Sequence, residues 1–101
     1  MANTSIKFEE LEDVLVLDDT TSGQKSQLIV YNDDYNSFDW VIQCFMEVCN
    51  HSEEQSEQLS IIVHFKGKAS VKTGSMSILK PMKDALIERG LSAVIETLVE
   101  D

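Results

Sequence analysis

Two apolar runs in this chain each end in polar side chains whose types favour recognition of an ammonium group. Asn32-Asp33-Asp34 follows residues 28–31 and directly precedes a helical pattern. His64 follows residues 61–63, just before Phe65-Lys66-Gly67. Amide and carboxylate oxygens and neutral imidazole are hydrogen-bond acceptors, whereas a charged α-amine presents three donors. The pattern therefore favours the binding of a cation over catalysis.

Each part of this pattern also has a plainer interpretation. An Asn-Asp-Asp sequence after a strand is commonly a turn followed by a helix N-cap. A lone histidine in an apolar run is commonly a core residue. A hydrolase using Asp33, Asp34 and His64 as catalysts or metal ligands is disfavoured, because the sequence offers no obvious nucleophile, second base or oxyanion element. We expect no enzymatic activity, no metal and no cofactor.

The composition sets the class of protein and of partner. A chain of 101 residues suffices for one domain with a modest core. Its formal net charge of -10 argues against nucleic acid or an anionic membrane as a partner, since both repel an acidic surface. The two cysteines, Cys44 and Cys49, lie within a helical pattern and suggest buried thiols in a reducing compartment. We expect a cytoplasmic protein, and a monomer.

The N-terminal residues read differently from the rest of the chain. Residues 1–24 contain an acidic patch and end in a turn-rich linker, which predicts a flexible acidic tail. Within it, the apolar residues 14–17 could form an extra edge strand or a segment that orders only on a partner. The folded domain is expected over residues 25–101.

Hydrophobic periodicity predicts an α+β domain over this second part. Helices are expected from Phe38, with Asn36 or Ser37 as N-cap, from Ser52, and around Pro81 in a first turn. Residues 61–65 could end the second helix or form a strand. The clearer strands are residues 26–31, 68–72 and 91–98. The order β-α-α-β-α-β predicts a small three-stranded sheet with three helices on one face.

The two polar corners carry a resemblance to a known family. Residues 32–41, Asn-Asp-Asp-Tyr-Asn-Ser-Phe-Asp-Trp-Val, followed by residues 63–69, Val-His-Phe-Lys-Gly-Lys-Ala, resemble the ClpS family. These bacterial adaptors deliver substrates with destabilising N-terminal residues, the N-degrons, to an AAA+ Clp ATPase-protease. The resemblance covers residues 27–71. It implies a fold similar to the ribosomal stalk protein C-terminal domain, with the N-domain of a Clp ATPase and N-degron peptides as partners.

The resemblance also implies roles for individual residues. Asn32, Asp33 and His64 match the positions that bind the substrate α-amino group. Positions at the rim and in the apolar side-chain pocket match Asp34, Asn36, Phe38, Val41, Leu59, Ser60 and Val63. The chain departs from the family pattern at Asn36-Ser37, where Thr-Pro is common, and at Phe38 and Ser60, where Met is common. The alternative function is a structural interaction domain, similar to the ribosomal stalk domain, without a ligand clamp.

Overall fold

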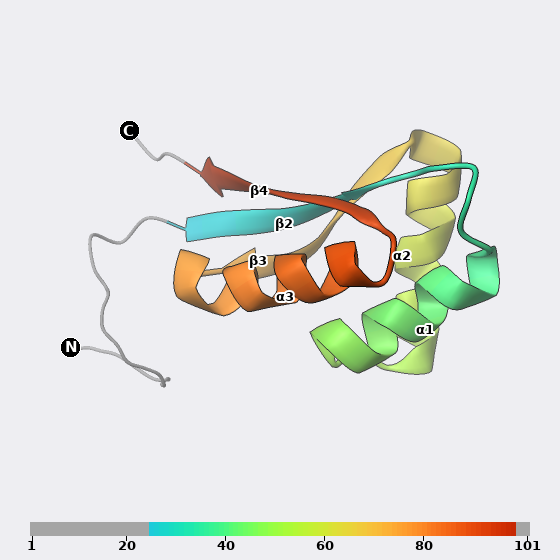
Figure 1. Cartoon of the computed structure of the whole chain (residues 1–101), viewed down its shortest axis with the longest axis horizontal. Helices are drawn as coiled ribbons and strands as arrows, with labels where there is room; N and C mark the ends of the chain where they lie inside the picture. The colour runs from blue at the N-terminus through green and yellow to red at the C-terminus, as the bar shows by residue number, and fades with distance from the viewer. Residues whose placement is uncertain (1–24, 99–101) are drawn as a thin grey trace.

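The structure, a computed structural model, describes residues 25–98 (Figure 1). Six elements follow one another: β2 (Lys25–Tyr31), α1 (Phe38–Cys49), α2 (Glu53–Lys66), β3 (Lys68–Gly74), α3 (Met76–Glu88) and β4 (Ser92–Leu98). This is the predicted β-α-α-β-α-β order. The predictions for residues 1–24, including a strand at residues 14–17, lie outside the described residues.

The three strands form one antiparallel sheet in the order β3-β2-β4. Val30 of the central strand is opposite Ala69 on one side and Ala93 on the other. The helices lie on one side of this sheet (Figure 1), which confirms the predicted α+β arrangement. Because alternate residues of a strand face opposite sides, Leu28 and Val30 point into the core that the helices cover.

Side-chain caps fix where the first two helices begin. The hydroxyl oxygen of Ser37 accepts a hydrogen bond from the backbone N–H of Trp40 (3.1 Å), so Ser37 rather than Asn36 is the N-cap of α1. The hydroxyl oxygen of Ser52 accepts from the N–H of Gln55 in the same way (3.1 Å), as the capping-box sequence predicts. Asn36 is therefore free for another role.

The ambiguous residues 61–65 are helical, and α2 continues to Lys66. It ends because Gly67 adopts a left-handed conformation (φ 90°), which lets its N–H donate to the carbonyl oxygen of Val63 (2.9 Å). Strand β3 begins at the next residue, Lys68. A glycine at this position thus reverses the chain and sets the end of α2 beside the end of β2.

The prediction that Pro81 lies in the first turn of the third helix is wrong. Helix α3 begins at Met76, so Pro81 is inside it and leaves the carbonyl oxygen of Ser77 without its usual helical donor. Pro81 is exposed at this point, and Leu79, one turn from the start, is fully buried. The burial of Leu79 therefore outweighs the lost hydrogen bond.

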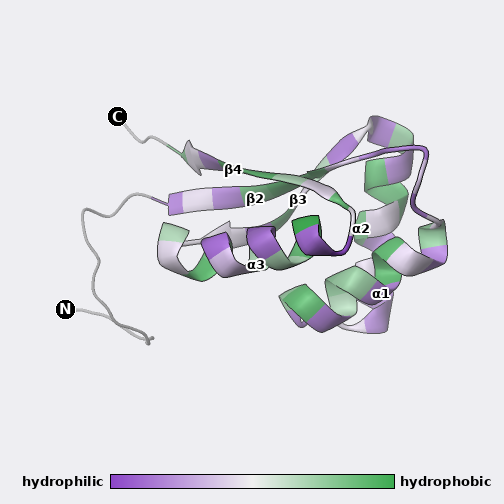
Figure 2. Cartoon of the chain, in the orientation of Figure 1, coloured by the Kyte–Doolittle hydropathy of each residue, from purple (hydrophilic) through white to green (hydrophobic). Residues whose placement is uncertain are grey.

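Helix α1 packs against α2 and α3, and apolar residues occupy most of its length (Figure 2). Cys44, Phe45 and Cys49 are fully buried, and both thiols are free. Burial raises the pKa of Cys49 to about 11, so this thiol stays protonated near neutral pH. None of the three described helices is long and apolar enough to span a bilayer.

Candidate functional site

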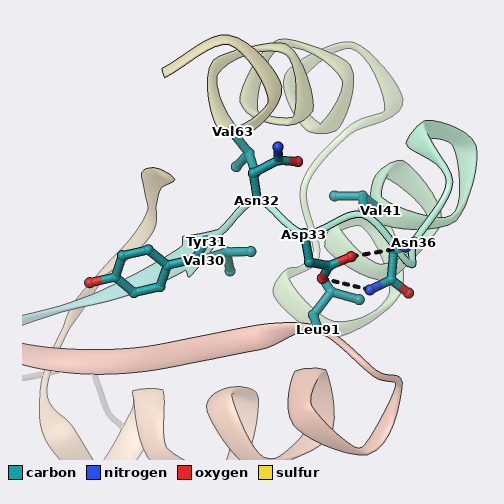
Figure 3. A pocket seen from close by; sticks show the side chains of 8 residues that line it. All are labelled: Val30, Tyr31, Asn32, Asp33, Asn36, Val41, Val63 and Leu91. Carbon is teal, nitrogen blue, oxygen red and sulfur yellow. Dashed lines mark hydrogen bonds between the residues drawn. The ribbon is translucent and has the colours of Figure 1, made fainter. Parts of the chain in front are cut away.

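A small cavity lies at the end of the central strand, where β2, α1, α2 and the start of β4 meet (Figure 3). Its lining combines polar groups of the loop after β2 with apolar side chains. The lining residues are Val30, Tyr31, Asn32, Asp33, Asn36, Val41, Val63 and Leu91. Five of them, Asn32, Asp33, Asn36, Val41 and Val63, are among the predicted site residues.

A backbone hydrogen bond brings the two predicted polar corners together. The N–H of Asn32 donates to the carbonyl oxygen of Gly67 (2.9 Å), immediately after Tyr31 pairs with Lys68 in the sheet. The residues just after β2 therefore lie beside the last turn of α2, which contains Val63 and His64. Positions about thirty residues apart in the sequence become neighbours in this way.

The carboxylate of Asp33 organises the loop between β2 and α1. Its Oδ1 accepts from the backbone N–H groups of Tyr35 (2.8 Å) and Asn36 (2.9 Å). Its Oδ2 accepts from the side-chain Nδ2 of Asn36 (2.8 Å), as Figure 3 shows. Three acceptor positions of this carboxylate are thus used within the loop, and roughly one of its four remains for a ligand.

These hydrogen bonds decide the charge of Asp33. Partial burial is the largest single influence and raises its pKa, but the bonds from the backbone of Asn36 and Tyr35 and from the Asn36 side chain outweigh it together. The net result is that the pKa of Asp33 is lower than that of an ordinary aspartate. Its negative charge is therefore present throughout the neutral range.

The side chains of the two residues that flank Asp33 in the sequence are available to a ligand. Asn32 and Asp34 are both exposed, and among residues 25–98 their side chains make no hydrogen bonds. Asn32 lines the cavity, whereas Asp34 does not. The amide oxygen of the first and the carboxylate of the second remain available as acceptors.

The other predicted site residues are not among those that line the cavity. His64 is exposed in the last turn of α2, directly after Val63, and its ring meets that of Phe65 edge-on (centroids 5.0 Å apart). Phe38 begins α1 with 40% of its surface exposed. Leu59 packs against the core, and Ser60 is buried with a hydroxyl that has no hydrogen-bond partner within the described residues.

Three lining residues, Val30, Tyr31 and Leu91, were not predicted. Val30 and Tyr31 directly precede the polar corner, so alternation along the strand could have placed one of them in the cavity wall. Leu91 follows α3, and its N–H donates to the carbonyl oxygen of Leu86 (3.0 Å). This is the C-terminal pattern in which an apolar residue after the glycine packs back on the helix, the signal that could have found Leu91.

The segment before Leu91 is attached to α1 and to the loop before it. The Nδ2 of Asn36 donates to the carbonyl oxygen of Gly90 (2.9 Å), and the indole Nε1 of Trp40 donates to that of Arg89 (3.0 Å). The Arg89 guanidinium lies over the Trp40 ring (6.0 Å) and forms an ion pair with Glu47. The segment that places Leu91 in the cavity wall is therefore held by contacts with α1 and with the loop before it.

The arrangement can accept a cation beside an apolar group. Asn32 and Asp33, which carry acceptor oxygens, line a space together with the apolar side chains of Val30, Val41, Val63 and Leu91. An ammonium group would find hydrogen-bond acceptors and a negative charge at one end. An aliphatic or aromatic side chain attached to it would find an apolar surface at the other.

Comparison with known families gives a match over residues 21–95, three quarters of the chain, to "ATP-dependent Clp protease adaptor protein ClpS". The chain belongs to the ClpS family. Two curated ClpS adapter proteins are similar to it. The one from Oleidesulfovibrio alaskensis is 28% identical over 67 residues, and the one from Escherichia coli O127:H6 is 31% identical over 67 residues.

These alignments cover 66% of this ClpS-family chain and 64% and 63% of the two relatives, so the chain spans somewhat less than two thirds of their length. A solved structure, that of Agrobacterium tumefaciens ClpS2 bound to L-phenylalaninamide, shares the fold with a TM-score of 0.67 and 23% identity. The match covers 76% of this chain and 100% of that one. The ClpS fold thus extends over the region that contains the cavity.

Proposed function

We propose that this chain is a non-enzymatic adaptor, which binds substrates with a free N-terminal hydrophobic residue and delivers them to an AAA+ Clp ATPase-protease. The observation that carries the proposal is the cavity itself, in which Asn32 and Asp33 meet the apolar side chains of Val41, Val63 and Leu91. The ligand of the similar Agrobacterium protein, L-phenylalaninamide, combines an α-amino group with a large apolar side chain. Both halves of such a ligand have a counterpart in this cavity.

The α-amino group is assigned to Asn32, Asp33 and His64, with Asp34 at the rim. A charged α-amine has three N–H donors and needs acceptors only. The amide oxygen of Asn32 and a neutral His64 imidazole supply two, and the free position on Oδ2 of Asp33 supplies the third. The ionised Asp33 carboxylate makes its bond charge-assisted, and Asp34 adds a second negative charge at the exposed edge.

The first side chain of the substrate is assigned to the apolar half of the cavity. Burying a Leu- or Phe-sized side chain there contributes about 1.5–3 kcal/mol, which selects large apolar residues over Gly or Ala. We assign four further residues to the border of this apolar half: Asn36, Phe38, Leu59 and Ser60. Ser60 is buried on α2 and is small where the family pattern commonly has Met, so β-branched residues such as Ile and Val are expected to be accepted as well.

The proposed partner is the N-domain of a Clp ATPase, and the adaptor is proposed to act as a cytoplasmic monomer. The formal charge of -10 supports a protein partner over nucleic acid or an anionic membrane. We assign the acidic residues 1–24 to the delivery step, because a charged, turn-rich segment can extend from the domain toward the ATPase.

Titration with four peptides tests the proposal directly. One pair begins with Leu and the other with Gly, and each pair differs only in a free or an acetylated N-terminus. Binding of the free Leu peptide alone is the expected result, because acetylation removes the cation and Gly lacks the apolar side chain. Equal binding of free and acetylated Leu peptides contradicts the clamp. A structural interaction domain without a ligand site binds none of the four, and cleavage of any peptide indicates an enzyme.

A further inference from the structure

Asn36 makes two hydrogen bonds that join two parts of the cavity lining. Its Nδ2 donates to Oδ2 of Asp33 (2.8 Å) and to the carbonyl oxygen of Gly90 (2.9 Å). A primary amide has two hydrogens on its nitrogen, so both bonds can form at once. Asp33 belongs to the polar end of the cavity, whereas Gly90 directly precedes Leu91 of the apolar wall. The Asn36 side chain thus joins its own loop to Gly90, which lies 54 residues further along the chain.

Gly90 lies in close contact with Asn36. Gly90 has φ 96°, a conformation that strongly favours glycine, and its N–H donates to the carbonyl oxygen of Ile87 (2.9 Å). This bond and the one from Leu91 to Leu86 use backbone N–H groups after α3 and leave the carbonyl oxygen of Gly90 available as an acceptor. The Asn36 amide supplies the donor for that carbonyl, and a Cβ at Gly90 would lie 3.6 Å from its Oδ1.

We propose that Asn36 is a positioning residue for this site: its amide holds the Asp33 carboxylate and the Gly90–Leu91 segment at a fixed separation. The resemblance counts Asn36 among the rim and side-chain pocket residues that contact the substrate, but its Nδ2 donates both of its hydrogen bonds to the protein itself. The separation that it fixes is the one between the ammonium-binding end and the apolar wall. The proposal takes its ligand from the proposed function, while the contacts that carry it exist without a ligand.

Trp40 provides a direct reporter of this connection. It is the single tryptophan of the chain, and its indole N–H donates to the carbonyl oxygen of Arg89, next to Gly90. If the Asn36 bond to Gly90 is lost, the Arg89–Leu91 segment is held to α1 mainly by Trp40 and by the Arg89 side chain. A looser segment exposes the indole N–H to water more often, which hydrogen exchange and fluorescence emission both detect.

Three variants separate positioning from stability. Asn36→Ala removes both bonds, whereas Asn36→Thr retains a single hydroxyl donor and can satisfy one partner at a time. Ser52→Ala is the control, because it removes one side-chain hydrogen bond, the N-cap of α2, and this bond involves neither Asp33 nor Gly90. Each variant, with all 101 residues, is measured without ligand, by exchange of the Trp40 indole N–H and by its emission, and then with a Leu-first peptide with a free N-terminus.

The expected result is a graded loss that the control does not share. In Asn36→Ala the indole N–H exchanges about tenfold faster, emission shifts to the red, and affinity for the Leu peptide falls about tenfold. Asn36→Thr should have an exchange rate, an emission maximum and a peptide affinity between those of Asn36→Ala and the unmodified protein. If Asn36→Ala does not fold, the values for Asn36→Thr test the proposal. Ser52→Ala melts at a lower temperature, with Trp40 exchange and peptide affinity unchanged below its transition.

Two outcomes overturn the proposal. One is Trp40 exchange and emission in both Asn36 variants equal to those of the unmodified protein. The other is a loss of peptide affinity in Ser52→Ala as large as that in the Asn36 variants, when the variants have equal free energies of unfolding. Failure of the proposed function looks different, because the unmodified protein then binds no free N-terminus at all. In that case the ligand-free Trp40 measurements still decide whether Asn36 fixes the Gly90–Leu91 segment.

Discussion

The backbone N–H of Asn32 donates to the carbonyl oxygen of Gly67 across 2.9 Å, joining the residue after the central strand to the residue after α2. This bond continues the pairing of β2 with β3 by one residue beyond Tyr31 and Lys68. It does not depend on either side chain. Substitutions of the Asn32 side chain should therefore alter binding without separating the two segments, which makes the site accessible to mutational tests.

Asn32→Ala, Asp33→Ala and His64→Ala should each weaken binding of a Leu-first peptide by about 1.5–3 kcal/mol, since each removes one acceptor from a charged donor. Isothermal titration gives the affinities. Asn32→Ala and His64→Ala should retain the melting temperature, because both side chains are exposed. Asp33→Ala should also melt earlier, because the carboxylate holds the loop. Unchanged affinity in all three variants would show that the amine binds elsewhere.

The stability of the protein should depend on Asp33 in acid. Its pKa in the folded protein is lowered from 3.8, so the ionised carboxylate stabilises the fold above pH 3.8 and this contribution is lost as pH falls through the folded-state pKa. Urea unfolding between pH 2 and 7, compared with Asp33→Asn, measures it. The two proteins should differ most near neutral pH and converge in acid. A difference that is constant with pH would mean that the carboxylate charge does not matter.

Ser56→Ala should stabilise the protein by about 1 kcal/mol. The Ser56 side chain is fully buried on α2, and its hydroxyl has no hydrogen-bond partner within residues 25–98, so alanine removes an uncompensated polar group and gains helix propensity. Ser52→Ala, on the same helix, should destabilise by a similar amount because its hydroxyl caps the N-terminus. Chemical denaturation of both variants should give opposite signs. Destabilisation by Ser56→Ala would reveal a partner for its hydroxyl.

Removal of residues 1–24 should separate binding from delivery. A protein that begins at Lys25 retains all the cavity residues, so its affinity for free N-terminal peptides should equal that of the full chain. Degradation of an N-degron substrate by the Clp ATPase-protease should be lost, because we assign delivery to this segment. An assay with purified protease and both proteins measures the rate. Undiminished degradation would leave residues 1–24 without a role in delivery.

Much of the fold follows from signals that act within a few residues. Ser52 with its capping box and Gly67 with its left-handed conformation set the two ends of α2, and both are readable in the sequence. The start of α3 was not readable in this way. There, the burial of Leu79 extends the helix ahead of Pro81, and burial depends on the tertiary packing of the whole domain.

In the candidate site, too, the residues that local sequence patterns predict differ from those that depend on tertiary structure. Asn32 and Asp33 could be predicted because a polar run directly after a strand stands out in the sequence. Leu91 could not be assigned to the cavity, because antiparallel pairing of β4 with β2 brings it there from 59 positions after Asn32. The bond from Asn36 to Gly90 could not be predicted either. In the sequence, Asn36 fits a helix N-cap and Gly90 fits the end of a helix, and neither pattern indicates that the two residues meet.

The end of α2 at Gly67 also has an electrostatic consequence. The peptide dipoles of a helix align, and they leave about half a negative charge at its C-terminal carbonyls. Helix α2 has fourteen residues, ends at Lys66, and is joined through Gly67 to Asn32, so this partial charge lies beside the candidate ammonium site. The attraction comes from the backbone and survives every side-chain substitution proposed above. A variant without the side-chain acceptors of Asn32, Asp33, Asp34 and His64 should therefore still prefer a charged N-terminus over an acetylated one.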